Sequence, residues 1–394
     1  MSPHRTKESL DADRFPSAPL EGTLLEVDEI KTHFKTPRGL VRAVDGVSFA
    51  LERGRTLGVV GESGSGKTVL ARSIMGLLPR KNVVREGSVR FEGKEIGDAD
   101  PDQMRHIWGS QMSMVFQDPM TSLNPVTRVG RQITESLRYH LDVSRNYANE
   151  LGVALLDSVG IPEPERRFRE YPHQLSGGMR QRVMIAIALA CGPKLLFADE
   201  PTTALDVTVQ AQILDLLREQ QEERFMAMIL VTHDLGVVAG RADEIAVMYA
   251  GKVVEKAPTS VLFTDMKMPY TEALLQSIPK LSDKSHTKLL TIAGRPPPLV
   301  NPPRGCRFAP RCFYVQDKCR EEEPPLIAGE TPGHEYRCWF PVGTPEGKEA
   351  LERNRKAGIA PPPPSEKSEE ATATDGQREG ALSANRASAP GGTT

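Results

Sequence analysis

The sequence predicts an α/β fold in which a mostly parallel sheet forms the core and helices cover it. Two observations lead to this fold class. The apolar segment TLGVV (56–60) is followed at once by a glycine-rich turn and by GKTVLARSIMGLL, which has helical spacing. Strand and helix patterns alternate again after residue 193, in KLLFADE, VQAQILDLLREQQEER and MAMILVTHD. Such alternation is typical of a parallel sheet between layers of helices.

Two further patterns predict smaller regions beside this core. The core and these two regions form a main domain at 23–280. LLEVDEIKTHF and VRAVDGVSFALERG alternate apolar and polar residues, which predicts two strands with one buried face and hence an antiparallel β region. RVGRQITESLRYH and ANELGVALLDSVG read as amphipathic helices, so we expect a helical insertion at about 117–172.

The ends of the chain differ from this main domain in composition. Residues 1–22 are polar and contain proline, and we expect them to be disordered. The proline-rich stretch GRPPPLVNPPRG marks a boundary, and a small cysteine-bearing segment is expected at 281–345. Residues 346–394 read as a low-complexity tail, although GKEALERNRKAG near its start could form a short helix.

Composition narrows the function class. The chain has 394 residues, 39% of them hydrophobic, which is enough for a sizeable core. A formal net charge of −2 gives no general reason to expect nucleic acid as a partner. We find neither the roughly twenty apolar residues that span a bilayer nor the apolar segment of a signal peptide, so we expect a cytoplasmic protein. Disulfides are rare in that compartment, and the five cysteines need another explanation.

The glycine-rich turn GESGSGKT fits the pattern of a phosphate-binding loop, G-x-x-x-x-G-K-[ST]. In such a loop the backbone N–H groups surround a phosphate, the lysine reaches the terminal phosphates, and the hydroxyl that follows binds Mg²⁺. The alternative is a strand turn that binds nothing, and the lysine and threonine at the expected positions argue against it. The predicted ATP-binding residues here are Gly61, Glu62, Ser63, Gly64, Ser65, Gly66, Lys67 and Thr68.

A matching acidic site follows the apolar strand in KLLFADE. We expect Asp199 to hold Mg²⁺ through water and Glu200 to polarise the attacking water as a general base. By itself an acidic pair after a strand is weak evidence, since a solvated turn has the same composition. Together with the phosphate loop it becomes strong evidence for ATP hydrolysis.

A second glycine-rich helix start, LSGGMRQR, forms a second anion site. One nucleotide hardly needs two such sites. We therefore expect Ser176, Gly177 and Gly178 to face the γ-phosphate bound by a second copy of the fold, so that ATP joins two subunits.

These motifs, in this order, resemble the ATP-binding subunits of ABC transporters, and the resemblance covers about residues 23–340. It implies the P-loop ABC ATPase fold and four further roles. Phe34 would stack on adenine, and Gln117 in VFQD would touch Mg²⁺ and the attacking water. Asp206 in TALD would organise the dimer, and His233 in VTHD would contact the γ-phosphate. Alone, each would be an ordinary strand or loop residue.

The finer resemblance is to the oligopeptide and dipeptide importers, carried by DPMTSLNP, YPHQLSGGMRQR, LDVTVQAQILDLL and NPPRGCRFAPRC. It implies a peripheral ATPase on the cytoplasmic face of the cell membrane. Its partners would be two integral membrane permeases, a second ATP-binding subunit that is usually a different chain, and an extracytoplasmic solute-binding protein. The alternative is a soluble ABC-type ATPase that acts on DNA or ribosomes. The compact helical insertion and the single ATPase domain argue against it.

Four cysteines, Cys306, Cys312, Cys319 and Cys338, are spaced C-x₅-C-x₆-C-x₁₈-C in the C-terminal segment. Four thiolates suit either tetrahedral Zn²⁺ or an iron–sulfur cluster. The long gaps favour the wider cluster, and the family resemblance implies [4Fe–4S]. Unbonded thiols or two disulfides are the remaining alternatives. Cys191 is expected in the core.

Overall fold

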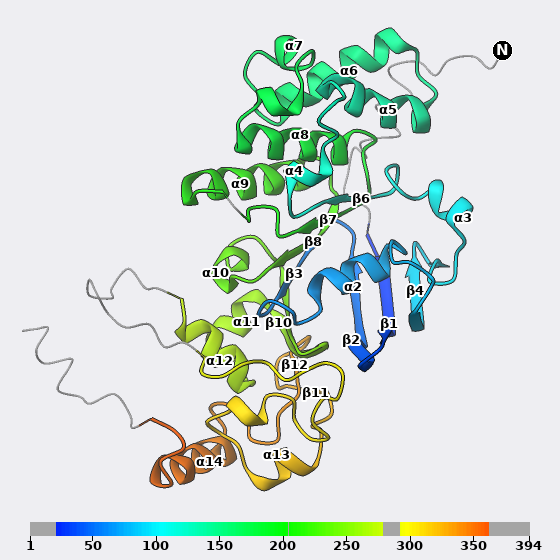
Figure 1. Ribbon diagram of the computed structural model, residues 1–394. Helices are drawn as coiled ribbons and strands as arrows, with labels where there is room; N and C mark the ends of the chain where they lie inside the picture. Colours follow the sequence, from blue (N-terminus) through cyan, green and yellow to red (C-terminus); the bar gives the residue numbers. More distant parts are fainter. Residues whose placement is uncertain (1–20, 204, 279–291, 362–394) are drawn as a thin grey trace, which may run out of the picture.

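The computed structural model describes residues 21–203, 205–278 and 292–361. Almost all of the disordered segment predicted at 1–22, and most of the tail predicted from 346, lie outside these residues. The described part contains two sheets, a helical region at one end and the cysteine-bearing segment at the other (Figure 1).

An eight-stranded sheet forms the centre, in the order β11-β12-β10-β9-β3-β8-β7-β6. Five neighbouring strands are parallel: β9 (Glu244–Tyr249), β3 (Thr56–Val60), β8 (Ala227–Thr232), β7 (Leu195–Asp199) and β6 (Met112–Val115). Three antiparallel strands complete the sheet: β10 (Lys252–Pro258), β12 (Glu335–Tyr336) and β11 (Ile327–Ala328). Every residue of β3, β7 and β8 is buried, as expected for parallel strands covered on both faces.

A separate antiparallel sheet has the order β2-β1-β4-β5 and contains both strands predicted from alternating residues. Its strands are β1 (Thr23–Thr36), β2 (Gly39–Glu52), β4 (Val83–Phe91) and β5 (Lys94–Glu95). Apolar side chains of this sheet, among them Leu25 and Val47, share one core with β3 and with α2 (Lys67–Ile74). The phosphate loop therefore lies between the two sheets.

Helices cover the parallel strands and form the upper region of Figure 1. That region contains α4 (Pro119–Ser122), α5 (Val129–Leu141), α6 (Arg145–Ser158), α7 (Pro164–Arg167) and α8 (Gly177–Leu189). The remaining helices of the main domain are α3 (Pro101–Arg105), α9 (Val207–Glu223), α10 (Leu235–Val238), α11 (Thr259–Thr264) and α12 (Pro269–Gln276). The predicted α/β class, with its parallel core, antiparallel β region and helical region, is confirmed.

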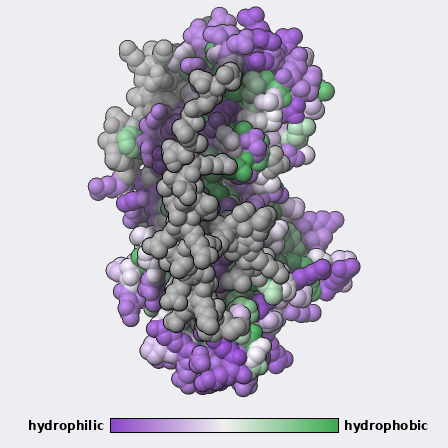
Figure 2. All heavy atoms as spheres, turned by 90° about the vertical axis from the view of Figure 1, so that its left-hand side faces the viewer, coloured by the Kyte–Doolittle hydropathy of each residue, from purple (hydrophilic) through white to green (hydrophobic). Residues whose placement is uncertain are grey.

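None of the helices in the described part of the chain has the length and apolarity needed to cross a membrane. On the face shown in Figure 2, hydrophilic side chains predominate at the helical end and at the C-terminal end, and hydrophobic ones form only small groups.

The C-terminal segment contains α13 (Asp317–Glu321) and extends further than predicted. Residues placed at the start of the low-complexity tail form α14 (Pro345–Lys356). Thr344 caps this helix, and the buried Asn354 donates from Nδ2 to the carbonyl oxygens of Phe313 and Val315, at 2.8 Å each. The predicted boundary at 346 is therefore too early, because these hydrogen bonds attach α14 to the cysteine-bearing segment.

Candidate nucleotide-binding site

The phosphate loop connects β3 to α2, and two of its glycines are required by geometry. Gly66 has φ 105° and precedes the first residue of α2, and a Cβ there would lie 2.2 Å from the carbonyl oxygen of Ala43. A Cβ on Gly61 would lie 2.1 Å from the carbonyl oxygen of Met248. Because these two positions carry no side chain, the loop backbone can approach β2 and β9 closely. The start of α2 follows directly, as in sites where a helix N-terminus binds an anion.

Lys67 is folded over this loop. Its Nζ donates to the carbonyl oxygens of Gly61 at 2.7 Å and Glu62 at 3.1 Å, and it lies 4.0 Å from Oε1 of Glu200. Burial lowers the pKa of Lys67, and the charge of Glu200 partly opposes this effect. A phosphate would supply negative charge to an ammonium group that the protein has largely removed from water.

Thr68 and Asp199 form the pair expected at a Mg²⁺ site. Thr68 Oγ1 donates to Oδ1 of Asp199 at 2.9 Å, whereas Oδ2 of Asp199 is buried and accepts no hydrogen bond. Burial raises the pKa of Asp199, and the hydrogen bond from Thr68 opposes that rise. A buried oxygen without a donor suits a cation or its bound water, so these residues fit Mg²⁺.

Glu200 lies at the centre of a cluster that brings the predicted catalytic residues together. Its Oε2 accepts from Gln117 Nε2 at 2.9 Å and from Thr203 Oγ1 at 3.0 Å, and Nδ1 of His233 lies 3.7 Å from the same oxygen. Glu200 has φ 46°, an uncommon conformation for a residue other than glycine. Its N–H donates to the carbonyl oxygen of Val231, which fixes this turn at the end of β7.

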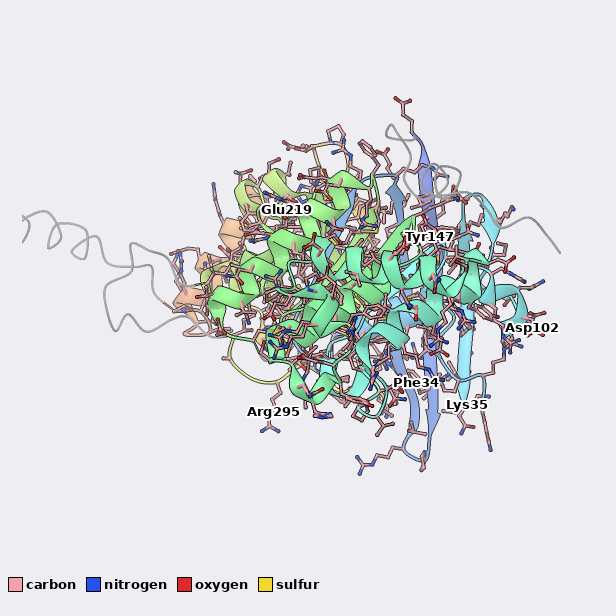
Figure 3. The ribbon with its side chains drawn as sticks, turned by 90° about the horizontal axis from the view of Figure 1, so that it is seen from above. Phe34, Lys35, Asp102, Tyr147, Glu219 and Arg295 are labelled. Carbon is pink, nitrogen blue, oxygen red and sulfur yellow. The ribbon has the colours of Figure 1, made fainter. Side chains whose placement is uncertain are left out.

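Phe34 lies on β1 next to Lys35, on the side of the molecule formed by the antiparallel sheet (Figure 3). Strand alternation places it on the same face as Thr32, whose Oγ1 lies 2.7 Å from Oγ of Ser73 in α2. The partly exposed Phe34 ring is therefore on the face of β1 that meets the helix after the phosphate loop.

The second glycine-rich motif begins α8, with Ser176 as an exposed N-cap that accepts from the N–H of Met179 at 3.3 Å. Gly177 and Gly178 follow in its first turn. Asp206 is likewise an exposed N-cap, of α9, and accepts from Val209. Among the described residues, no hydrogen bond or ion pair joins Ser176, Gly177, Gly178 or Asp206 to the phosphate loop of the same chain.

Two residues that were not predicted from the sequence contact the phosphate loop, although they are far from it along the chain. Tyr270 Oη accepts from the N–H of Glu62 at 2.9 Å, and the guanidinium group of Arg311 binds the Glu62 carboxylate. No local signal could have revealed these contacts, because the partners lie more than two hundred residues from the loop.

The four predicted cysteine ligands are free thiols. Cys306 and Cys312 pack against the small apolar cluster that contains Cys319, and the N–H of Cys306 donates to the carbonyl oxygen of Cys319 at 2.8 Å. Cys338 packs against the main core. Burial raises the pKa of all four thiols.

Backbone N–H groups near each of these sulfurs oppose that rise, and one of them is the donor in the Tyr314 to Cys312 Sγ hydrogen bond of 3.3 Å. Within the described ranges, no three His, Cys, Asp or Glu side chains are grouped closely enough to hold a metal ion. Cys191 is buried in the main core, as predicted.

Comparison with known proteins agrees with this site. The ABC transporter family model matches residues 44–203, and the model of the oligopeptide/dipeptide transporter C-terminal region matches residues 254–319. The chain is 50% identical over 319 residues to the oligopeptide transport ATP-binding protein OppD of Bacillus subtilis, covering 80% of this chain and 88% of that protein. It is 49% identical to OppD of Salmonella typhimurium, covering 81% and 94%.

A solved structure of a dimeric ATP-binding cassette, in a post-hydrolysis state with ADP and Pi, is similar in fold and 27% identical. Its TM-score is 0.55, and the match covers 60% of this chain and 99% of that one. The site geometry, the family models and the long, highly identical relatives agree, and the chain therefore belongs to the ATP-hydrolysing, ATP-binding subunits of the ABC transporter family.

Proposed function

We propose that this chain hydrolyses ATP to drive the import of peptides through partner permeases. The observation that carries the proposal is the identity of 50% and 49% with two oligopeptide transport ATP-binding proteins, each over 319 aligned residues. The match to the oligopeptide/dipeptide transporter C-terminal region adds to it. The chain would act as a peripheral protein on the cytoplasmic face of the cell membrane. It would need two permeases, a second ATP-binding subunit and an extracytoplasmic solute-binding protein.

The catalytic roles follow from the contacts at the end of β7. Glu200 would take the proton of the attacking water, while Gln117 and His233, which face the same carboxylate oxygen, would orient that water and sense the γ-phosphate. Lys67 would bind the terminal phosphates. Mg²⁺, held through Thr68, Asp199 and Gln117, would neutralise charge on the phosphate oxygens.

Two exposed surfaces support assembly with partners. The helix starts at Ser176 and Asp206 are exposed, and in the part of the chain that the structure describes no hydrogen bond or ion pair joins them to their own phosphate loop. This favours a site completed by a second ATP-binding subunit. In the helical region, Met120, Val126 and Tyr139 expose 63%, 81% and 65% of their surface. Exposed apolar side chains indicate a protein interface where they form a continuous patch, and we propose that these three belong to the surface that contacts the permeases.

We also propose that Cys306, Cys312, Cys319 and Cys338 hold a [4Fe–4S] cluster. The presence of four cysteines in one segment supports this, as does the hydrogen bond of 3.3 Å from the Tyr314 N–H to Cys312 Sγ, since hydrogen bonds to sulfur tune cluster ligands. The four thiols would have to draw together around the cluster, because no three of them are grouped as metal ligands within the described residues. Zn²⁺ is the alternative. Protein purified without oxygen should contain iron and sulfide and absorb visible light. Colourless protein without either element would overturn the cluster, and stoichiometric zinc would favour the alternative.

The import function is tested by purifying the tagged chain from native membranes in mild detergent and identifying the proteins that accompany it. We expect two multi-span permeases and a sister ATPase. The competing hypothesis, an ABC-type ATPase that acts on DNA or ribosomes, instead predicts recovery with those partners in the soluble fraction. The relatives named above do not favour it.

A further inference from the structure

The phosphate loop receives an ion pair from the cysteine-bearing segment. Arg311 donates from Nη1 to Oε2 of Glu62 at 2.6 Å and from Nη2 to Oε1 at 2.9 Å. The Arg311 side chain is 4% exposed and that of Glu62 is 27% exposed. This two-pronged geometry, shielded from water, is the strong form of a charge-assisted hydrogen bond. It joins residues that are 249 positions apart.

Other groups hold the Arg311 guanidinium in place. Nε donates to the carbonyl oxygen of Ala293 at 2.9 Å, and Nη2 donates to that of Ile292 at 3.2 Å. Nη1 donates to Oη of Tyr249 at 3.2 Å. All three guanidinium nitrogens therefore donate hydrogen bonds to groups other than Glu62. The guanidinium group is fixed by these bonds and can hold the Glu62 carboxylate in one position.

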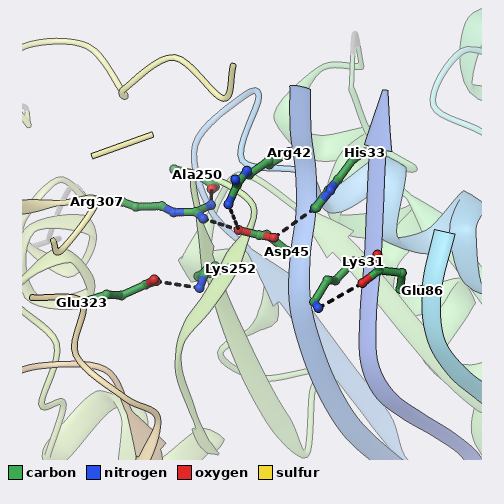
Figure 4. A network of polar contacts seen from close by, with 9 residues as sticks. All are labelled: Lys31, His33, Arg42, Asp45, Glu86, Ala250, Lys252, Arg307 and Glu323. Carbon is green, nitrogen blue, oxygen red and sulfur yellow. Dashed lines mark hydrogen bonds and ion pairs between the residues drawn. The ribbon is translucent and has the colours of Figure 1, made fainter. Parts of the chain in front are cut away.

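A second arginine of the cysteine-bearing segment is linked to another residue of the phosphate loop. Arg307 binds the Asp45 carboxylate and donates from Nη1 to the carbonyl oxygen of Ala250 at 2.5 Å (Figure 4). The next residue, Gly251, donates its N–H to the carbonyl oxygen of Ser65 at 2.8 Å. Arg311 thus binds the loop at Glu62, and Arg307 is linked to it at Ser65 through the Ala250–Gly251 backbone. Both arginines belong to one seven-residue stretch that begins and ends with a cysteine, CRFAPRC.

We propose that Arg311 is a positioning residue for ATP binding, which fixes the phosphate loop through Glu62 and makes its shape depend on the cysteine-bearing segment. Glu62 adjoins Gly61, and the carbonyl oxygens of both residues accept from Lys67 Nζ. A displaced Glu62 therefore moves the lysine that binds phosphate. A loop held in its binding shape loses little freedom when ATP binds, so release of the loop weakens ATP binding.

The test measures ATP affinity and turnover in the full-length chain for Arg311→Gln, Arg311→Lys, Glu62→Gln and the double variant Arg311→Gln/Glu62→Gln. We expect Arg311→Gln to raise the Kd for Mg-ATP and the KM by about tenfold, with kcat nearly unchanged, because the lost contact is a charge-assisted pair remote from the reacting atoms. Arg311→Lys should recover only part of the affinity, since an ammonium cannot bind both carboxylate oxygens in the same way.

The double variant distinguishes positioning from general destabilisation. If Arg311 acts through Glu62, the two losses of ATP affinity should not add. The Kd of the double variant should then equal the higher of the two Kd values measured for the single variants. Arg320→Ala is the matched control: Arg320 lies in the same segment, its side chain is 57% exposed, and it forms an ion pair with the exposed Asp317. Its affinity should equal that of the wild type.

Unchanged affinity in both Arg311→Gln and Glu62→Gln would overturn the proposal, as would fully additive losses in the double variant. If the Arg311→Gln variant does not fold, the ATP affinity of Glu62→Gln decides whether the proposal holds. That variant should fold, because glutamine has the shape of glutamate and the side chain at this position is partly exposed. ATP affinity of Glu62→Gln equal to the wild type would then also overturn it. None of these measurements involves peptides or permeases, so their result is independent of the proposed cargo.

Discussion

Replacing Glu200 by glutamine tests the catalytic assignment most sharply, because the change keeps the shape of the side chain and removes its charge. The amide can still accept from Gln117 and Thr203, so the turn at the end of β7 should remain intact. Without a general base, kcat should fall by about 10²- to 10⁴-fold.

The same change should strengthen ATP binding. Lys67 Nζ lies 4.0 Å from Glu200 Oε1, and both side chains are largely buried. Unit charges at about 4 Å interact by about 4 kcal/mol at an effective dielectric constant of about 20, and this attraction competes with phosphate for the lysine. Only part of it is regained on binding, so we expect an affinity gain of about tenfold and accumulation of an ATP-bound dimer.

The assay pairs steady-state ATP hydrolysis with size-exclusion chromatography in Mg-ATP. The control is Glu222→Gln, the same chemical change on an exposed side chain of α9, which should behave as the wild type. Hydrolysis by Glu200→Gln at the wild-type rate would refute the role of Glu200 as base. A slow variant that binds ATP more weakly would refute the electrostatic part of the reasoning.

Three further predictions follow from local geometry. Gly66→Ala should abolish ATP binding in a titration, because its Cβ would lie 2.2 Å from a backbone oxygen, whereas Gly93→Ala, with open space around it, should bind normally. Asp45→Asn should lower the unfolding free energy by about 3 kcal/mol at pH 7. Burial raises the pKa of Asp45, but the Arg307 guanidinium outweighs this effect and holds the pKa below its ordinary value of 3.8. The difference in unfolding free energy between variant and wild type should therefore shrink as the pH falls below that value. A difference that stays constant with pH would contradict this. Asn354→Ala should lower stability by about 2 kcal/mol in urea unfolding, because two backbone carbonyls lose their donor; an unchanged midpoint would show that α14 does not stabilise the segment.

The sequence predicted the parts of the site that depend on local pattern. A buried strand, a glycine-rich turn and a helical pattern follow one another without interruption. The strand was therefore placed to the residue, whereas α2 begins one residue later and ends four residues earlier than the predicted segment GKTVLARSIMGLL. The alternating residues of β1 and β2 were also informative, because apolar side chains of both strands pack into the core. Burial is less regular than simple alternation, since residues 43–47 of β2 are all buried.

Contacts between distant segments could not be predicted. The motif that contains Arg311, CRFAPRC, indicated candidate metal ligands through its cysteines. Nothing in its composition indicates that the arginine contacts Glu62. The boundary of the tail was misplaced for a similar reason. The sequence of α14 is polar, as in a helix exposed to solvent on all sides. Its attachment to the cysteine-bearing segment depends on one buried side chain, that of Asn354.

The most direct test of the central claim is peptide uptake by the reconstituted complex of this chain, its sister ATPase, the two permeases and the binding protein. We predict ATP-dependent accumulation of peptide with the wild-type chain, and its loss when Glu200→Gln is the only change, although the variant still binds ATP. Equal uptake by wild type and variant, or ATP hydrolysis that drives no peptide transport in the intact complex, would contradict the account.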